Sequence, residues 1–273
     1  MPQRAARRLS ALIIATVIAT GLIGAPGLQA RDPAQARDPV IVAAASDLQF
    51  ALAEAAEAYR RMTGDAVKVS FGSSGNFYRQ IRQGAPYDIY MSADESFVLD
   101  LAGDGLTLDR GALYAIGRIV IIAPEGSPLE ADSELNGLRA ALAEGRIDKF
   151  AIPNPEHAPY GGRAEEALRR AGLWQALATK LVLGENVSQA AQFAISGSTQ
   201  GGIIAYSLAL SPKLSARGSF ALIPQAWHRP LRQRMVLLKK AGHGARAFYD
   251  FILGPAGRAI LARHGFAAPD ETP

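Results

Sequence analysis

The 273-residue sequence contains no cysteine, only four histidines and 20% charged residues. Without cysteine the chain cannot form a disulfide scaffold, a thiolate zinc site or a cysteine nucleophile, and it cannot be anchored through a lipidated cysteine. The low charge and the 49% hydrophobic content exclude an intrinsically disordered chain. The length suits two domains of about 100–150 residues each, or one large domain.

The sequence patterns of several enzyme classes are also missing. There is no G-x-S-x-G nucleophile elbow, no H-E-x-x-H zinc motif, no G-x-x-x-x-G-K phosphate loop and no G-x-G-x-x-G dinucleotide motif. The acidic residues Asp88, Asp94, Glu165 and Glu166 have the spacing of helix caps or of a solvated face. We therefore expect no enzymatic activity, no cofactor and no metal held directly by protein side chains.

The first 36 residues have the pattern of a secretory signal peptide. Three arginines among the first eight residues precede an apolar run of 15 residues at 11–25, and Ala34-Gln35-Ala36 matches a cleavage site. Cleavage after Ala30 is the second possibility. A transmembrane anchor is the alternative, but the run is shorter than the ~20 residues that span a bilayer. We expect export to the periplasm with cleavage of residues 1–36.

The positive charge of the chain belongs mostly to this leader. The formal net charge is +4 and the pI about 9.4. Removing residues 1–36 takes away four arginines and one aspartate, which leaves 25 basic against 24 acidic residues. No basic run interleaved with aromatic residues remains, so nucleic acid is not an expected partner. No later segment approaches 18 uninterrupted apolar residues, so the mature chain is not expected to be embedded in a membrane.

Short apolar runs alternate with amphipathic stretches along the mature chain. In the first series we predict strands at 40–44, 67–71 and 87–91 and helices at 48–59, 77–81 and 94–102. In the second we predict strands at 119–123, 150–153, 181–183, 202–205 and 220–224 and helices at 135–143, 162–171 and 187–195. A strand at 235–238 and helices at 245–253 and 255–264 end the chain. This order favours mostly parallel sheets covered by helices on both faces.

The two series, together with a final strand and two helices that rejoin the first series, predict an α/β fold with two doubly wound lobes. Two crossing segments would join them, with a ligand cleft between. Lobe one would comprise residues 37–117 and 225–273, and lobe two residues 118–224. A single doubly wound sheet would give a similar alternation, so this alternative stays open.

Four predicted strand-to-helix junctions are rich in hydroxyl groups and small residues: 43–48, 71–76, 154–162 and 184–188. Ligands of open α/β sheets bind beyond the carboxyl ends of strands, where helix N-termini present free N–H groups. Each junction also has an ordinary explanation. Ser46 and Gln49 match a capping box, residues 71–76 suit a turn with a cap, His157 suits a surface loop, and Asn186 or Ser188 suits a cap.

Considered together, the junctions favour a small anion that stays charged at all working pH values. Two junctions from each lobe would bring hydroxyl groups and the positive ends of helix dipoles to one cleft. None of the four cores contains lysine or arginine, so discrimination would depend on donor geometry and cavity size. A pocket for a carboxylate or a phosphate monoester more often includes an arginine fork.

At these junctions the sequence resembles the periplasmic molybdate-binding proteins of ABC transporters, within the type II periplasmic binding-protein superfamily. The stretches that carry the resemblance are AAASDL at 43–48, FGSSGNFYRQIRQGAPYDIYMSAD at 71–94, IPNPEHAPYG at 152–161, GENV at 184–187 and FYDFILGPAGRAIL at 248–261. The resemblance covers residues 40–266. It implies two α/β lobes that close on molybdate, usually with tungstate accepted as well, and delivery to an ABC transporter permease by a monomer.

The resemblance also implies the site residues. Ser46 and Ser74 would contribute hydroxyl and N–H groups, and Tyr160 and Val187 their backbone N–H groups. Ser73 and Asp47 are secondary candidates. Asp47 departs from the chemistry of an anion site because its carboxylate would repel a dianion, and we expect it to point outward at the first helical turn.

Three alternatives remain at this stage. The first is a binder of the same fold for sulfate, phosphate or another small anion, because sequence does not give the cavity volume. The second is a secreted serine-dependent hydrolase, whose turnover of an activated ester would be lost in Ser46→Ala or Ser74→Ala. The third is the effector domain of a transcription regulator, against which the leader and the absence of DNA-binding helices argue.

Overall fold

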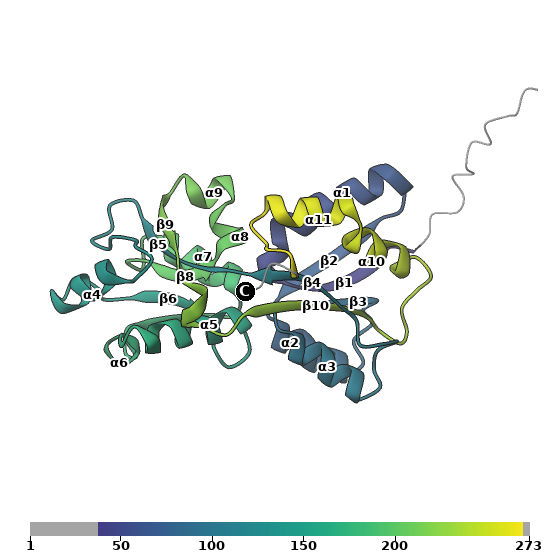
Figure 1. Ribbon diagram of the computed structural model, residues 1–273, viewed down its shortest axis with the longest axis horizontal. Coiled ribbons are helices and arrows are strands. Elements are labelled where there is room, and N and C mark those ends of the chain that lie inside the picture. The colour runs from purple at the N-terminus through teal and green to yellow at the C-terminus, as the bar shows by residue number, and fades with distance from the viewer. Residues whose placement is uncertain (1–37, 270–273) are drawn as a thin grey trace, which may run out of the picture. The chain divides into compact units, whose positions relative to one another are not determined.

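The computed structural model describes residues 38–269, and the predicted signal peptide at 1–36 lies outside that range. The described residues form two five-stranded sheets covered by helices (Figure 1), with strand orders β2-β1-β3-β10-β4 and β7-β6-β8-β5-β9. The strands are β1 (Val40–Ala45), β2 (Val67–Gly72), β3 (Ile89–Ser92), β4 (Ala112–Gly117), β5 (Ile119–Pro124), β6 (Phe150–Pro153), β7 (Leu181–Gly184), β8 (Gly202–Ala205), β9 (Gly218–Leu222) and β10 (Leu231–Leu237). The α-helices are α1 (Gln49–Thr63), α2 (Ser74–Arg82), α3 (Glu95–Gly103), α4 (Asn136–Ala143), α5 (Pro159–Arg170), α6 (Trp174–Leu177), α7 (Val187–Ile195), α8 (Tyr206–Ala209), α9 (Pro212–Ser215), α10 (Ala245–Leu253) and α11 (Pro255–Arg263). Two 3-10 turns are η1 (Ser46–Leu48) and η2 (Gln225–Trp227).

The first sheet and its helices form lobe one, whose core lies on both faces of the sheet. The stripe Ala51, Leu52, Ala55 and Tyr59 packs α1 onto the face that α10 and α11 also cover. Helices α2 and α3 pack on the opposite face (Figure 1). Gly64 ends α1 with φ +81°, a conformation that glycine adopts without a steric penalty.

The second sheet belongs to lobe two, so the predicted architecture of two α/β lobes is confirmed. The expectation of mostly parallel sheets is wrong, because both sheets are mixed. In lobe one β10 runs antiparallel to β3 and β4, and in lobe two β5 runs antiparallel to β8 and β9. The reason is the connectivity: β5 and β10 are the strands that enter each lobe directly from the other one, without a helical crossover.

Two short segments connect the lobes. Arg118 alone separates β4 from β5, and residues 223–230 separate β9 from β10. The strands of the first sheet fall within 37–117 and 225–273, and those of the second within 118–224. The largest hydrophobic cluster, mainly in lobe two, also includes Ala45, Ala93 and Leu231 from lobe one. The apolar packing therefore continues between the lobes beside the crossings.

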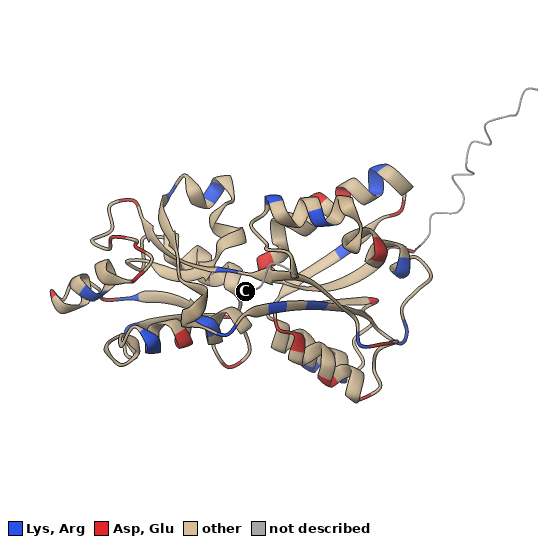
Figure 2. Cartoon of the chain, in the orientation of Figure 1, with Lys and Arg blue, Asp and Glu red and all other residues tan. Residues whose placement is uncertain are grey.

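Charged residues of both signs are spread over the two lobes without a continuous stripe of one sign in this view (Figure 2). Among the helices at 38–269, none combines the length and the apolar character needed to cross a bilayer.

Candidate functional site

The structure brings all six predicted site residues to the wall of one small cavity between the lobes. The cavity has a volume of about 10 Å³, which is space for about one water molecule. Its wall consists of Ala45, Ser46, Asp47, Gly72, Ser73, Ser74, Ala93, Ala158, Pro159, Tyr160 and Val187. None of these lining residues is basic. The wall is formed where β1 and β2 end and where α2, α5 and α7 begin.

Ser46 connects the lobes through its hydroxyl group. Its Oγ donates to Asn186 Oδ1 at 3.1 Å and accepts from the backbone N–H of Ser188 at 3.2 Å. Ser188 Oγ in turn donates to the backbone oxygen of Ser46 at 2.9 Å. The capping-box interpretation is wrong, because η1 has no side-chain cap and α1 begins only at Gln49. Asn186 does cap α7, as one of the two predicted candidates.

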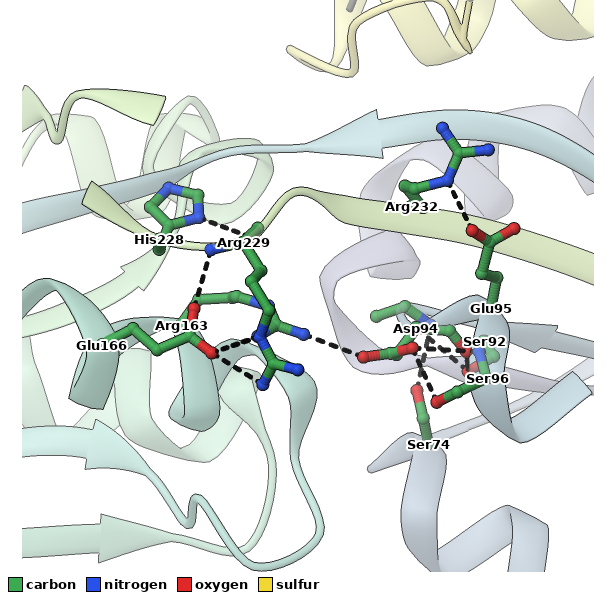
Figure 3. Close-up of polar contacts among 11 residues, drawn as sticks. Ser74, Ser92, Asp94, Glu95, Ser96, Arg163, Glu166, His228, Arg229 and Arg232 are labelled. Carbon is green, nitrogen blue, oxygen red and sulfur yellow. Dashed lines mark hydrogen bonds and ion pairs between the residues drawn. The ribbon is translucent and has the colours of Figure 1, made fainter. Parts of the chain in front are cut away.

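Ser73 and Ser74 have different hydrogen-bond partners although they are adjacent. Ser73 Oγ caps α2 by accepting from the N–H of Asn76 at 3.3 Å. Ser74 is fully buried, and its Oγ accepts from the N–H of Ala93 at 3.0 Å, beside the start of α3 (Figure 3). The Tyr90 hydroxyl donates to the backbone oxygen of Ser74 at 2.8 Å. These bonds fix the first turn of α2 against the end of β3.

His157 lies in the loop before α5, as expected, but its side chain packs against lobe one. Its side chain is 9% exposed, and its Nδ1 lies 3.1 Å from Ser73 Oγ. Its backbone oxygen accepts from the N–H of Gly75 at 2.9 Å. A Cβ on Gly75 would lie 2.7 Å from that oxygen, so the close approach of the two lobes requires glycine here.

Tyr160 and Val187 lie in the first turns of α5 and α7. Backbone N–H groups in a first turn have no acceptor within the helix, and the helix dipole makes this end favourable for an anion. Pro159 occupies the first position of α5, where the missing N–H costs nothing. Gly161 allows α5 to start against the end of β6, because a Cβ there would lie 2.3 Å from the backbone oxygen of Pro153.

Asp47 is buried in the cavity wall, so the expectation that it points outward is wrong. Its Oδ2 accepts from the Tyr160 hydroxyl at 2.9 Å and from Gln233 Nε2 at 2.6 Å. The Tyr114 hydroxyl donates to Gln233 Oε1 at 2.7 Å. The network therefore joins η1 and α5 to β4 and β10, the two strands of lobe one that adjoin the crossing segments. Gly117 provides the space, because a Cβ there would lie 2.4 Å from the Tyr160 hydroxyl oxygen.

Burial controls the protonation of this network. Burial raises the pKa of the Asp47 carboxyl to about 6, against the opposing effect of the hydrogen bonds from Gln233 and Tyr160 and of the nearby backbone N–H groups of Asp47 and Leu48. Burial also holds the pKa of Tyr160 well above its usual value of 10, and the nearby Asp47 charge acts in the same direction. Tyr160 is therefore a neutral hydrogen-bond donor at any working pH.

A second contact between the lobes is an ion-pair cluster around Arg163 (Figure 3). The buried Arg163 of α5 pairs with Asp94 of lobe one at 2.9 Å and with Glu166 at 2.5 Å. Glu166 also accepts from Arg229 at 2.7 Å. Sequence reasoning assigned Asp94 and Glu166 to caps and solvated faces, and Asp94 does cap α3. It missed the ion pair, since no spacing pattern relates residues 69 positions apart.

No group of three or more potential metal-ligating side chains occurs within residues 38–269.

A family model described as bacterial extracellular solute-binding protein matches residues 40–267. The chain is 33% identical to the molybdate-binding protein ModA of Rhodobacter capsulatus over 230 residues, which covers 83% of this chain and 87% of that one. It is 32% identical to ModA of Escherichia coli K12 over 235 residues, with 83% and 88% covered. The solved periplasmic molybdate-binding protein of Azotobacter vinelandii has a TM-score of 0.76 at 30% identity, with 84% of this chain and 99% of that chain covered.

Proposed function

Because the chain belongs to the bacterial extracellular solute-binding protein family, we propose that it captures molybdate and tungstate and delivers them to the permease of an ABC transporter. The observation that carries this proposal is the interlobe cavity, which gathers two serine hydroxyls and the first turns of three helices around a wall without a basic side chain. That combination suits a small oxyanion, which neutral donors and helix dipoles hold without an ion pair. The similarity to molybdate-binding proteins supports the choice of oxyanion.

In this proposal the protein contacts the oxygen atoms of the anion and not its metal. Ser46 and Ser74 contribute hydroxyl and N–H groups, and Tyr160 and Val187 contribute backbone N–H groups. Ser73 contributes by capping α2, which orients the first turn that carries Ser74. No bond is made or broken, and neither a cofactor nor a catalytic residue is required.

Entry of the anion requires the lobes to separate. The present space of about 10 Å³ holds about one water molecule, which is too little for a central atom with four oxygens. The Ser46 hydroxyl is engaged with Asn186 and Ser188, so these interlobe bonds must open as the anion takes their place. The two crossing segments are the natural hinge for such a motion.

The route to this role includes export. We propose that residues 1–36 form a signal peptide that is removed, and that residues 37–273 work as a monomer in the periplasm. Mass spectrometry of the protein recovered from the periplasm tests the cleavage site after Ala36 or Ala30.

Calorimetry on residues 37–273 tests the proposed ligand. We expect heat from molybdate and tungstate at micromolar protein concentration, and weaker binding of sulfate and phosphate. Absence of heat from molybdate would contradict the proposal, and tighter binding of sulfate than of molybdate would identify the protein as a binder of a different anion.

A further inference from the structure

Asp47 places a carboxyl group in the wall of the cavity that we propose for the oxyanion. The residue is 1% exposed, and both side-chain hydrogen bonds go to Oδ2, from Tyr160 and Gln233. Oδ1 is also buried and has no hydrogen-bond partner among the described residues. Buried polar atoms nearly always have partners, so this oxygen is the one acceptor of the carboxyl group that is still available to a ligand.

Within the described part of the chain the hydrogen-bond partners of this carboxyl group are neutral. The elements around it contribute neutral groups: the backbone N–H groups of Asp47 and Leu48, the Tyr160 hydroxyl, the Gln233 amide and, behind it, the Tyr114 hydroxyl. The Ser207 hydroxyl donates to the backbone oxygen of Asp47. The titratable members are tyrosines, and burial holds the pKa of Tyr160 and of Tyr114 well above 10. Within residues 38–269 no lysine, arginine or histidine side chain bonds to Asp47.

An ionised Asp47 beside a bound dianion would therefore put three negative charges in one dry site. Like charges at close range in such a site repel strongly, and the group with an accessible pKa takes up a proton instead. A proton on Oδ1 removes one charge. It also converts the unpartnered acceptor into an O–H donor for an oxygen of the anion, while Oδ2 keeps its two bonds.

We propose that oxyanion capture by this protein is coupled to a proton, which solvent supplies and which is held between Asp47 Oδ1 and an oxygen of the bound anion. This inference rests on the proposed function and adds a specificity-determining residue to the same site. With the carboxyl pKa raised to about 6 by burial, most molecules carry an ionised Asp47 at pH 7.5 before binding. The complex then takes up close to one proton. At pH 5 the carboxyl is already protonated, and the uptake approaches zero.

Calorimetry with molybdate at pH 7.5 in two buffers that differ in their heat of ionisation measures this uptake directly. We expect about one proton per anion in the wild type and none in Asp47→Asn, whose amide reproduces the neutral, donating carboxyl. From pH 6.5 to 8.5 the wild-type Kd should rise by up to about tenfold per pH unit, and the Kd of Asp47→Asn should stay constant within about twofold. Asp250→Asn is the matched control, because Asp250 is an exposed residue of α10 paired with Arg246, and it should behave as the wild type.

The outcomes distinguish a failure of the proton coupling from a failure of the proposed function. Molybdate binding without proton uptake and with a flat pH profile would overturn the coupling and leave the proposed function intact. Uptake that persists in Asp47→Asn would overturn the role of Asp47. If that variant does not fold, the wild-type buffer pair still decides, because an uptake below half a proton rejects the coupling. If the wild type binds no oxyanion in any buffer, the proposed function fails and the coupling with it.

Discussion

Ser46 and Ser74 line the same cavity from different elements, and both hydroxyls already accept hydrogen bonds from backbone N–H groups. Ser46 Oγ accepts from Ser188 in lobe two, whereas Ser74 Oγ accepts from Ala93 within lobe one. The two side chains therefore have different structural roles. Ser46 holds the lobes together, and Ser74 holds its own lobe in shape.

Replacing either serine by alanine tests their role toward the anion. Loss of one hydrogen bond to a charged group costs about 1.5–3 kcal/mol, so Ser46→Ala and Ser74→Ala should each weaken molybdate binding by about 10- to 150-fold in calorimetry. Ser215→Ala, at the end of α9 in lobe two, is a control outside the cavity wall. Unchanged affinity in both cavity variants would reject these residues as ligands.

Asp47 gives a separate prediction for stability in the absence of ligand. Because burial raises its pKa from 3.8 to about 6, the group's contribution to stability is complete below pH 3.8 and is lost as the pH rises through 6. The total change is about 3 kcal/mol. Asp47→Asn lacks this loss, so its free energy of unfolding relative to the wild type should increase by about that amount from pH 4 to pH 8.

Urea unfolding of both proteins at pH 4, 6 and 8 measures the difference. Glu54, Glu95 and Glu166 have lowered pKa values, so their contributions are lost as the pH falls, but they are common to both proteins and cancel. A difference that is constant with pH would show that Asp47 has the same pKa in the folded and unfolded chains.

At the scale of elements, the cavity is positioned by the starts of α2, α5 and α7, and close packing fixes where α5 starts. Gly161 and Gly162 are neighbours in α5 with opposite surroundings. A Cβ on Gly161 would lie 2.3 Å from the backbone oxygen of Pro153, whereas a Cβ on Gly162 has no atom within 4 Å. Backbone atoms cannot rotate away as a flexible side chain does.

Gly161→Ala should therefore shift the first turn of α5 away from β6. We expect a loss of about 1–3 kcal/mol in the free energy of unfolding from overpacking, together with weaker molybdate binding because Tyr160 lies in the displaced turn. Gly162→Ala is the matched control and should gain up to about 1 kcal/mol from the better helix propensity of alanine. Equal effects of the two substitutions on binding would contradict this account of α5.

The elements themselves were largely predictable, because hydrophobic periodicity is a local property. The strands at 150–153 and 202–205 and the helices at 187–195 and 245–253 have the predicted bounds. Strand β4 was not predicted, and its residues ALYAIG lie between the two predicted series. It is a strand because β10, more than 110 positions later in the chain, pairs with it.

The cavity was predictable for a different reason. Residues at the carboxyl ends of neighbouring strands come together whatever the loops contain, so the four junctions were expected at one cleft. Their partners were not predictable. The bond from Ser46 to Asn186 and the burial of Asp47 depend on how the second lobe lies against the first, and no local pattern contains that information. That the gathered residues hold an oxyanion stays a prediction.

At the scale of the whole molecule, polar contacts between the lobes surround the cavity. The Asp47 network joins η1 to α5 and to strands β4 and β10, and the ion pair between Asp94 and Arg163 links the start of α3 to α5. On another side, the N–H of Gly75 bonds to the backbone oxygen of His157. The described state is therefore one in which the lobes are in direct contact, with little room left between them.

Gly75 is the position at which this contact can be blocked without disturbing either lobe. A Cβ there would lie 2.7 Å from the backbone oxygen of His157, and His157 belongs to the other lobe. Separation of the lobes removes this clash, whereas a clash inside one lobe would force the side chains of that lobe's core to rearrange. Gly75→Ala should therefore leave the free energy of unfolding within about 1 kcal/mol of the wild type, because alanine is also the better helix former.

Molybdate binding by Gly75→Ala should instead weaken by at least about tenfold, which corresponds to ~1.4 kcal/mol of the closing free energy. Small-angle X-ray scattering should show that saturating molybdate reduces the radius of gyration of the wild type more than that of the variant. Gly103→Ala is the matched control, because Gly103 ends a lobe-one helix and a Cβ there meets no atom within 4 Å. Wild-type affinity and wild-type contraction in Gly75→Ala would mean that the contact between Gly75 and His157 is absent from the bound state, so that the lobes close on the anion in another arrangement.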